Sequence, residues 1–100
     1  MLIYVAVGGD NATLERAKKI THDLQIQNPS DCYICPLIAF SHLDSALNED
    51  NVIDLKIDLL SVCDRLLITS ENHKHIECEI DFAELVGMEV VHLAKEEIRS

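Results

Sequence analysis

Short apolar runs alternate with amphipathic stretches along the whole chain. The apolar runs lack polar alternation, so we expect strands that are covered on both faces, as in a parallel sheet. The longer stretches repeat their apolar residues every three or four positions, which predicts helices. The pattern predicts these elements in order: strand 2–7, helix 12–25, strand 32–36, helix 49–62, strand 65–69, helix 74–86 and strand 89–93.

This regular alternation predicts an α/β fold. We expect residues 1–100 to form one domain, a three-layer, Rossmann-like sandwich with a parallel sheet of about four strands in an order near 2-1-3-4. No repeat, linker or low-complexity segment divides the chain. Asn11 is the expected N-cap of the first helix.

Glu79 breaks the pattern of the last predicted helix. The apolar residues of this helix fall on one arc, and other acidic residues such as Glu77 fall on the opposite side. Glu79 instead lies inside the apolar arc, three residues after Ile76 and four before Ala83. A buried ionised carboxylate is costly unless something compensates it. We therefore expect Glu79 to face a pocket and to have a raised pKa. The alternative is a helix that starts near Ile76, in which Glu79 simply caps free N–H groups.

The loops that follow the predicted strands are the expected binding region, because ligands of open parallel sheets bind beyond the carboxyl ends of the strands. These loops contain Gly8-Gly9-Asp10-Asn11, the segment from Pro36 onward, and Ser70. The helix of Glu79 begins just after the third loop. Two glycines allow the backbone to approach a ligand closely, and the helix start that follows them can bind a phosphate. A plain tight turn is the alternative.

A basic cluster, His73, Lys74 and His75, precedes Glu79 and is a second candidate for phosphate binding. Metal ligation by the two histidines is disfavoured, because residues two apart on a helix do not face each other. We expect neither a metal nor a cofactor.

The charge of the chain restricts its partners. The formal net charge of −10 repels nucleic-acid backbones and anionic membranes, so we expect no polynucleotide and no membrane as a partner. A small nucleotide stays compatible with this charge. The chain has no bilayer-spanning apolar run and no signal-peptide pattern, and we expect a cytoplasmic protein. Cys32 and Cys35 lie three apart on a predicted strand and hence on opposite faces, which favours reduced structural thiols.

The 49–62 helix has more apolar surface than one sheet face needs. One stripe consists of Val52, Leu55, Leu59 and Cys63, and a second consists of Ile53, Ile57 and Leu60. The second stripe predicts a homodimer through this helix, with coverage by the rest of the chain as the alternative.

Five segments, in order, resemble the nucleoside 2-deoxyribosyltransferase-like superfamily, especially its small phage and bacterial members of poorly defined function. They are Leu2–Ala6, Glu15–Ile20, Cys35–Leu37, Ile57–Leu66 and Glu79–Ala83. The last of them, Glu-Ile-x-Phe-Ala followed by Gly87 and a closing strand, is the most specific.

The resemblance implies that Glu79 is a nucleophile. In that family the matching Glu attacks the anomeric carbon of a nucleoside and forms a glycosyl-enzyme intermediate, which is sound chemistry for an N-glycosidic bond. Asp58 is the nearest match to the family's Asp that handles the base. The resemblance thus implies a nucleoside or nucleotide N-glycosidase, or a 2-deoxyribosyltransferase.

Two alternatives stay open. His73-Lys74-His75 replaces the Ser-x-Gly stretch that usually precedes the nucleophile helix, which favours a non-catalytic nucleotide-binding or interaction module on the same fold. The stretch from Ile68 to Asn72 leading to Glu79 also resembles the catalytic-glutamate region of TIR domains, which implies an NAD glycohydrolase.

Overall fold

The computed structural model describes residues 1–9, 12–43 and 49–93. The elements in chain order are β1 (Leu2–Ala6), α1 (Leu14–Gln27), β2 (Cys32–Ile34), α2 (Pro36–Ala39), a 3-10 turn η1 (Ser41–Leu43), α3 (Glu49–Ser61), β3 (Arg65–Ile68), α4 (Glu77–Val86) and β4 (Glu89–His92). Among the described residues, no helix has the length and hydrophobicity needed to cross a bilayer.

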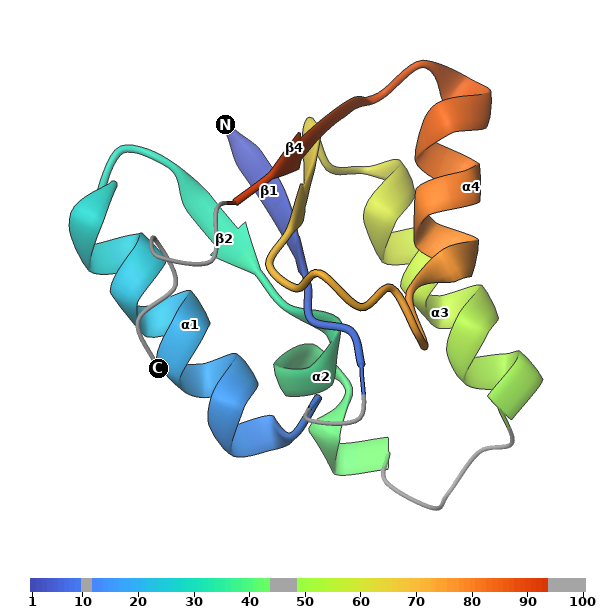
Figure 1. Cartoon of the computed structure of the whole chain (residues 1–100), viewed down its shortest axis with the longest axis horizontal. Coiled ribbons are helices and arrows are strands. Elements are labelled where there is room, and N and C mark those ends of the chain that lie inside the picture. The colour runs from blue at the N-terminus through green and yellow to red at the C-terminus, as the bar shows by residue number, and fades with distance from the viewer. Residues whose placement is uncertain (10–11, 44–48, 94–100) are drawn as a thin grey trace.

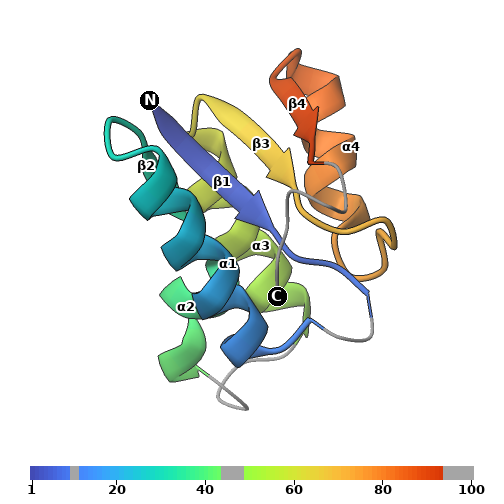
Figure 2. The same ribbon diagram turned by 60° about the vertical axis from the view of Figure 1, so that its left-hand side comes forward.

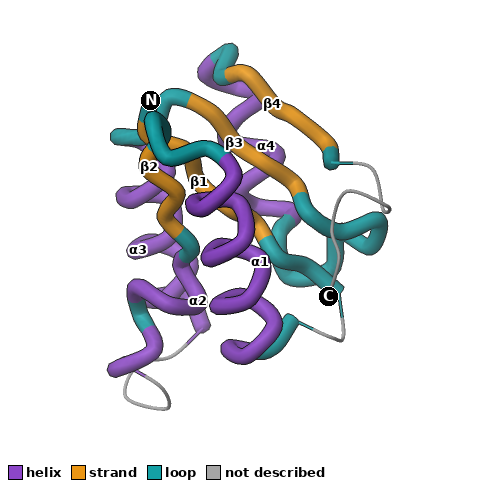
Figure 3. The backbone as a smooth tube through the Cα atoms, turned by 90° about the vertical axis from the view of Figure 1, so that its left-hand side faces the viewer, coloured by secondary structure: helices purple, strands orange, loops and turns teal. Residues whose placement is uncertain are grey.

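The four strands form one parallel sheet in the order β2-β1-β3-β4, so the predicted α/β fold and strand order are confirmed. Helix α1 lies on one side of the sheet, and α3 and α4 lie on the other (Figures 1 and 2). Figure 3 shows the sheet from the side of α1. The strand β1 is central and supplies both cores, because its side chains alternate between the two faces.

Two hydrophobic clusters fill the layers. Tyr4 and Ala6 of β1 pack with Leu60 of α3 and Ala83 of α4 on one face. Val5 and Val7 pack with α1 and with Cys35 on the other face. Burial on both faces explains why the first strand reads as a continuous apolar run.

Helix α1 begins later than the sequence predicts. Its N-cap is Thr13, whose Oγ1 accepts a hydrogen bond from the backbone N–H of Arg16 at 3.2 Å. The expectation of Asn11 as N-cap is therefore wrong, and Asn11 itself is outside the described residues. Thr13 serves as the N-cap because its hydroxyl accepts from the N3 amide of the helix.

Helix α4 begins at Glu77, three residues after the predicted start. The residues before it form a turn instead, in which Asn72 Oδ1 accepts from the N–H of Lys74 at 2.9 Å and Ser70 Oγ donates to the carbonyl of Asn72 at 3.0 Å. His75 then adopts a positive φ of 75°, which a helix does not allow. Local side-chain hydrogen bonds thus compete successfully with the helix.

The second apolar stripe of α3 has fewer outward-facing residues than the sequence predicts. Leu60 is fully buried in the core beneath α3, so it is not part of an outer surface. Ile53 and Ile57 are half-buried. The surplus apolar surface therefore reduces to these two residues and their neighbours.

Candidate functional site

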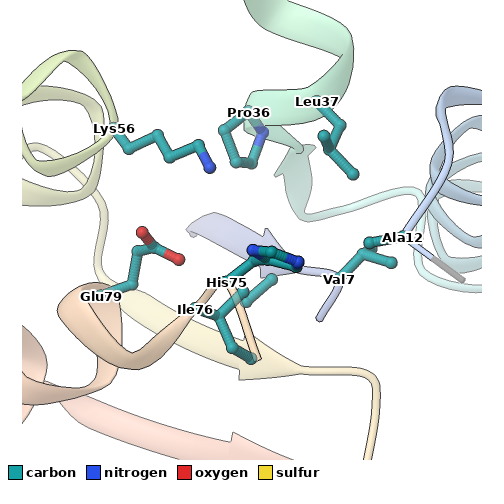
Figure 4. Close-up of a pocket in the computed structure, with 9 residues that line it drawn as sticks. Val7, Ala12, Pro36, Leu37, Lys56, His75, Ile76 and Glu79 are labelled. Atoms are coloured by element: carbon teal, nitrogen blue, oxygen red, sulfur yellow. The ribbon is translucent and has the colours of Figure 1, made fainter. Parts of the chain in front are cut away.

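A cavity of about 190 Å³ lies beyond the carboxyl ends of β1 and β2. Its walls come from the end of β1, the start of α2, helix α3, and the loop and first turn of α4 (Figure 4). The lining residues are Ala6, Val7, Ala12, Pro36, Leu37, Lys56, His75, Ile76 and Glu79. Six of the nine lining side chains are apolar, and the other three carry a carboxyl, an ammonium and an imidazole.

Glu79 lies in this cavity, as the sequence predicts. Its side chain is only 2% exposed, and the carboxyl group points into the cavity (Figure 4). Burial raises the pKa of Glu79 above its ordinary value, while the Lys56 ammonium opposes that rise and Glu77 adds to it. The predicted burial and the predicted direction of the pKa are confirmed.

The late start of α4 also changes the position of Glu79 in the helix. With Ile76 as N-cap, Glu79 lies in the first turn, where the helix dipole favours a carboxylate. Ile76 has no side-chain capping bond, and the described residues show no hydrogen bond to the Glu79 carboxyl. The dipole explains why a carboxyl is tolerated there, and the cavity explains what it faces.

Lys56 is the site residue that the sequence analysis missed. It extends from α3 across the cavity toward Pro36, with its ammonium above the Glu79 carboxyl (Figure 4). The signal was present, because Lys56 lies four residues after Val52 and four before Leu60, inside an apolar arc. The same reasoning that isolates Glu79 on α4 isolates Lys56 on α3.

The glycine loop and Ser70 are used to hold the backbone together. The N–H of Gly8 donates to Ser70 Oγ at 3.0 Å, and the N–H of Gly9 donates to the carbonyl of Lys74 at 2.8 Å. A Cβ at Gly8 would lie 2.7 Å from the carbonyl oxygen of Asn72, so this position needs glycine for close packing. These amides are therefore not open to a phosphate, and the tight-turn alternative describes them.

The basic cluster is divided by the fold. His75 lines the cavity, whereas the His73 ring lies against His92 at the end of β4, with ring centroids 5.7 Å apart. Lys74 is exposed, and its carbonyl accepts from Gly9. Only His75 among the three lines the cavity with Glu79. Its positive φ is a strained conformation of the kind found at functional sites.

Asp58 is not brought to the cavity. It is exposed on α3, two positions after Lys56 and hence about 200° further around the helix. Pro36 is buried at the start of α2 and forms part of the wall. Asp10 and Asn11, the other predicted binding residues, lie outside the described residues.

Tyr4 is a second residue that the sequence analysis did not single out. It is fully buried on β1, and its hydroxyl has no hydrogen-bond partner among the described residues. Burial is the main cause that raises the pKa of Tyr4, and the Glu79 carboxyl adds to it, which places the hydroxyl within electrostatic reach of the site. A buried hydroxyl that lacks a hydrogen-bond partner is unusual and costly.

The cysteines Cys32, Cys35, Cys63 and Cys78 form no disulfide in the structure. Cys32 on β2 is exposed, and Cys35 is buried but lies just after β2 as the N-cap of α2, so the predicted strand 32–36 ends too late. Burial raises the pKa of the Cys35 thiol, and Lys56 is among the groups that lower it. Within the described ranges, no group of three or more His, Cys, Asp or Glu side chains is arranged to hold a metal ion.

Comparison of the chain with protein-family models, with curated proteins and with solved structures gives no match.

Proposed function

We propose that the protein cleaves the N-glycosidic bond of a small nucleoside or nucleotide, with Glu79 as the nucleophile. The observation that carries this proposal is the buried Glu79 carboxyl facing a cavity at the carboxyl end of the sheet. A carboxylate that is held in an apolar site and open to a ligand is a typical covalent nucleophile for glycosyl transfer. The resemblance to the nucleoside 2-deoxyribosyltransferase-like superfamily supports the same assignment for this residue.

The reaction needs two groups. A Glu79 oxygen attacks the anomeric carbon, the bond from that carbon to the base nitrogen breaks, and its electron pair stays on the base. The leaving base takes a proton, and the His75 imidazole in the described cavity wall is the proposed donor. Water, or a second base in a transferase, then attacks the anomeric carbon and gives its proton to the His75 imidazole that donated one before, while the bond from that carbon to the Glu79 oxygen breaks and its electron pair returns to the carboxylate. His75 takes the acid role that the resemblance gave to Asp58.

A non-catalytic nucleotide-binding module is the second candidate. It is favoured by the absence of a second carboxylate from the described cavity wall, since glycosidases commonly use a pair. The cavity volume of about 190 Å³ is also smaller than the roughly 300–1,000 Å³ of typical small-molecule sites. A sugar or a base fits this space more readily than a whole dinucleotide such as NAD. An NAD glycohydrolase is therefore the third candidate function.

The test is base release from a panel of nucleosides, 5′-nucleotides and NAD, followed by chromatography. In Glu79→Gln we expect release to fall by on the order of 10³-fold or more, because the nucleophile is lost. In His75→Asn, which tolerates the positive φ, we expect a fall of roughly 10²–10⁴-fold for substrates with poor leaving bases.

The matched control is Glu84→Gln, which removes the same charge from an exposed position of α4 and should leave release unchanged. If the unmutated protein releases no base from any compound but binds one of them, the binding module replaces the enzyme. Equal loss in E84Q and E79Q would remove Glu79 from the mechanism.

A further inference from the structure

Lys56 and Glu79 meet although each interrupts an apolar arc of its own helix. Lys56 is on α3 and Glu79 is on α4, and the two helices pack side by side on the same face of the sheet (Figure 1). Both side chains extend into the same space and line one cavity (Figure 4). The two helices thus place opposite charges on their apolar arcs, and both charges face the same space. Each charge can offset the cost of burying the other.

The two groups are close enough to act on each other without a direct ion pair. Among the described residues, the ion pairs within 4.0 Å do not include Lys56 with Glu79. The space between them is the cavity itself, so a ligand can enter between carboxyl and ammonium. An opposite charge that faces the same cavity favours the ionised form of a carboxyl, and Lys56 is the group that lowers the pKa of Glu79.

The dipole of α4 also favours ionisation of Glu79, but Lys56 is the described side chain whose charge lowers the pKa of this carboxyl. Glu77, on the same helix, is a like charge that disfavours ionisation. Tyr4, on β1, is buried, and within the described part of the chain its hydroxyl has no partner. Cys35, which follows β2 as the N-cap of α2, is a thiol whose pKa burial raises and Lys56 lowers. His75 borders the cavity from the loop before α4.

We propose that Lys56 is a positioning residue that keeps the Glu79 carboxyl ionised while leaving it unbonded and open to the cavity. A direct ion pair would occupy the carboxylate oxygens, and without a facing cation burial and Glu77 would favour the protonated form more strongly. An ammonium that faces the carboxyl without pairing with it favours ionisation and leaves the oxygens open to the cavity. The role concerns the state of Glu79 and does not depend on which ligand enters, so it can be tested without a substrate.

The experiment follows the side-chain carboxyl carbon of Glu79 by NMR in ¹³C-labelled protein between pH 4 and 9. The signal is assigned by its loss in Glu79→Gln. In Lys56→Met we expect the titration midpoint of Glu79 to rise by about one pH unit or more, because the opposing charge is gone. In Lys56→Arg, which keeps the charge, the midpoint should stay near that of the unmutated protein.

Lys19→Met is the matched control. Lys19 is exposed on α1, and its replacement makes the same change in net charge far from the cavity. A midpoint in K56M that moves no further than in K19M overturns the proposal. If the protein releases base, K56M should also move the acid limb of the pH–rate profile upward, whereas a merely structural loss would lower the rate at all pH values.

A K56M chain that does not fold at neutral pH still gives an answer. The proposal then requires the double variant K56M/E79Q to fold under the same conditions, because the uncompensated carboxylate has been removed. A double variant that also fails to fold overturns the proposal, as does a K56M chain that is no more stable at pH 4 than at pH 7.

Discussion

Replacement of Gly8 by Ala tests how the loop after β1 supports the cavity. A Cβ at this position would lie 2.7 Å from the carbonyl oxygen of Asn72, 3.0 Å from that of Lys74 and 3.1 Å from Ile76 Cδ1. Two of these neighbours are backbone atoms, which cannot rotate out of the way. The segment from residue 70 to 76, which ends at the cavity, must therefore move.

The cost follows from two terms. Overpacking of a close contact costs about 1–3 kcal/mol. Movement of the segment also weakens the 3.0 Å hydrogen bond from Gly8 N–H to Ser70 Oγ, and such a bond contributes about 1 kcal/mol net. We expect Gly8→Ala to lower the free energy of unfolding by about 2–4 kcal/mol, a large share of the ~5–15 kcal/mol of a typical domain.

The assay is urea unfolding followed by circular dichroism, together with amide NMR spectra. Gly87→Ala is the control, because Gly87 has a positive φ of 74° but no atom within 4 Å of an added Cβ. Its cost is the backbone strain alone, about 1–2 kcal/mol. Only Gly8→Ala should shift the amide signals of residues 72–76. An unfolding free energy of Gly8→Ala within about 0.5 kcal/mol of the unmutated protein would refute the steric reasoning.

Two further predictions concern pH and assembly. Burial raises the pKa of Glu79 above 4.5, so the protonated carboxyl stabilises the fold fully below about pH 4.5, and this stabilisation is lost as the pH rises through the raised pKa. The unfolding free energy of E79Q minus that of the unmutated protein should therefore increase with pH. A difference that does not change with pH contradicts this prediction. We also propose a homodimer through α3 that buries upwards of about 1,000 Å²; Ile57→Glu should then sediment as a monomer, and an unmutated protein that is already monomeric at high concentration contradicts the proposal.

The fold was predictable because its determinants are local or periodic. Unbroken apolar runs such as Leu66–Ile68 require cover on both faces, and the spacing of the helices fixes their inward sides. What failed was the detail of helix starts. Whether a helix begins at residue 74 or 77 depends on competition between helical bonds and the turn built by Ser70 and Asn72, and composition alone does not decide it.

The site was predictable only in part, for a related reason. Glu79 could be found because its own helix supplies the contrast. The role of Gly8 and Ser70 could not be predicted, because these two hydrogen-bonded residues lie 62 positions apart in the sequence. Glycines between a strand and a helix are consistent with both an anion site and a tight contact between loops, and only the position of the 70–76 segment distinguishes these possibilities.

The pairing of Lys56 with Glu79 extends the reasoning from single helices to two. A charged residue inside an apolar arc is ambiguous, because it can be a capping residue or a chance exposure. Two such residues of opposite charge, on helices that flank the same strand and pack on the same face, restrict each other, since each offers the compensation that the other lacks. The strand order places α3 and α4 next to each other across β3. A search of a predicted α/β topology for opposite charges on neighbouring buried arcs would therefore have identified this cavity from the sequence.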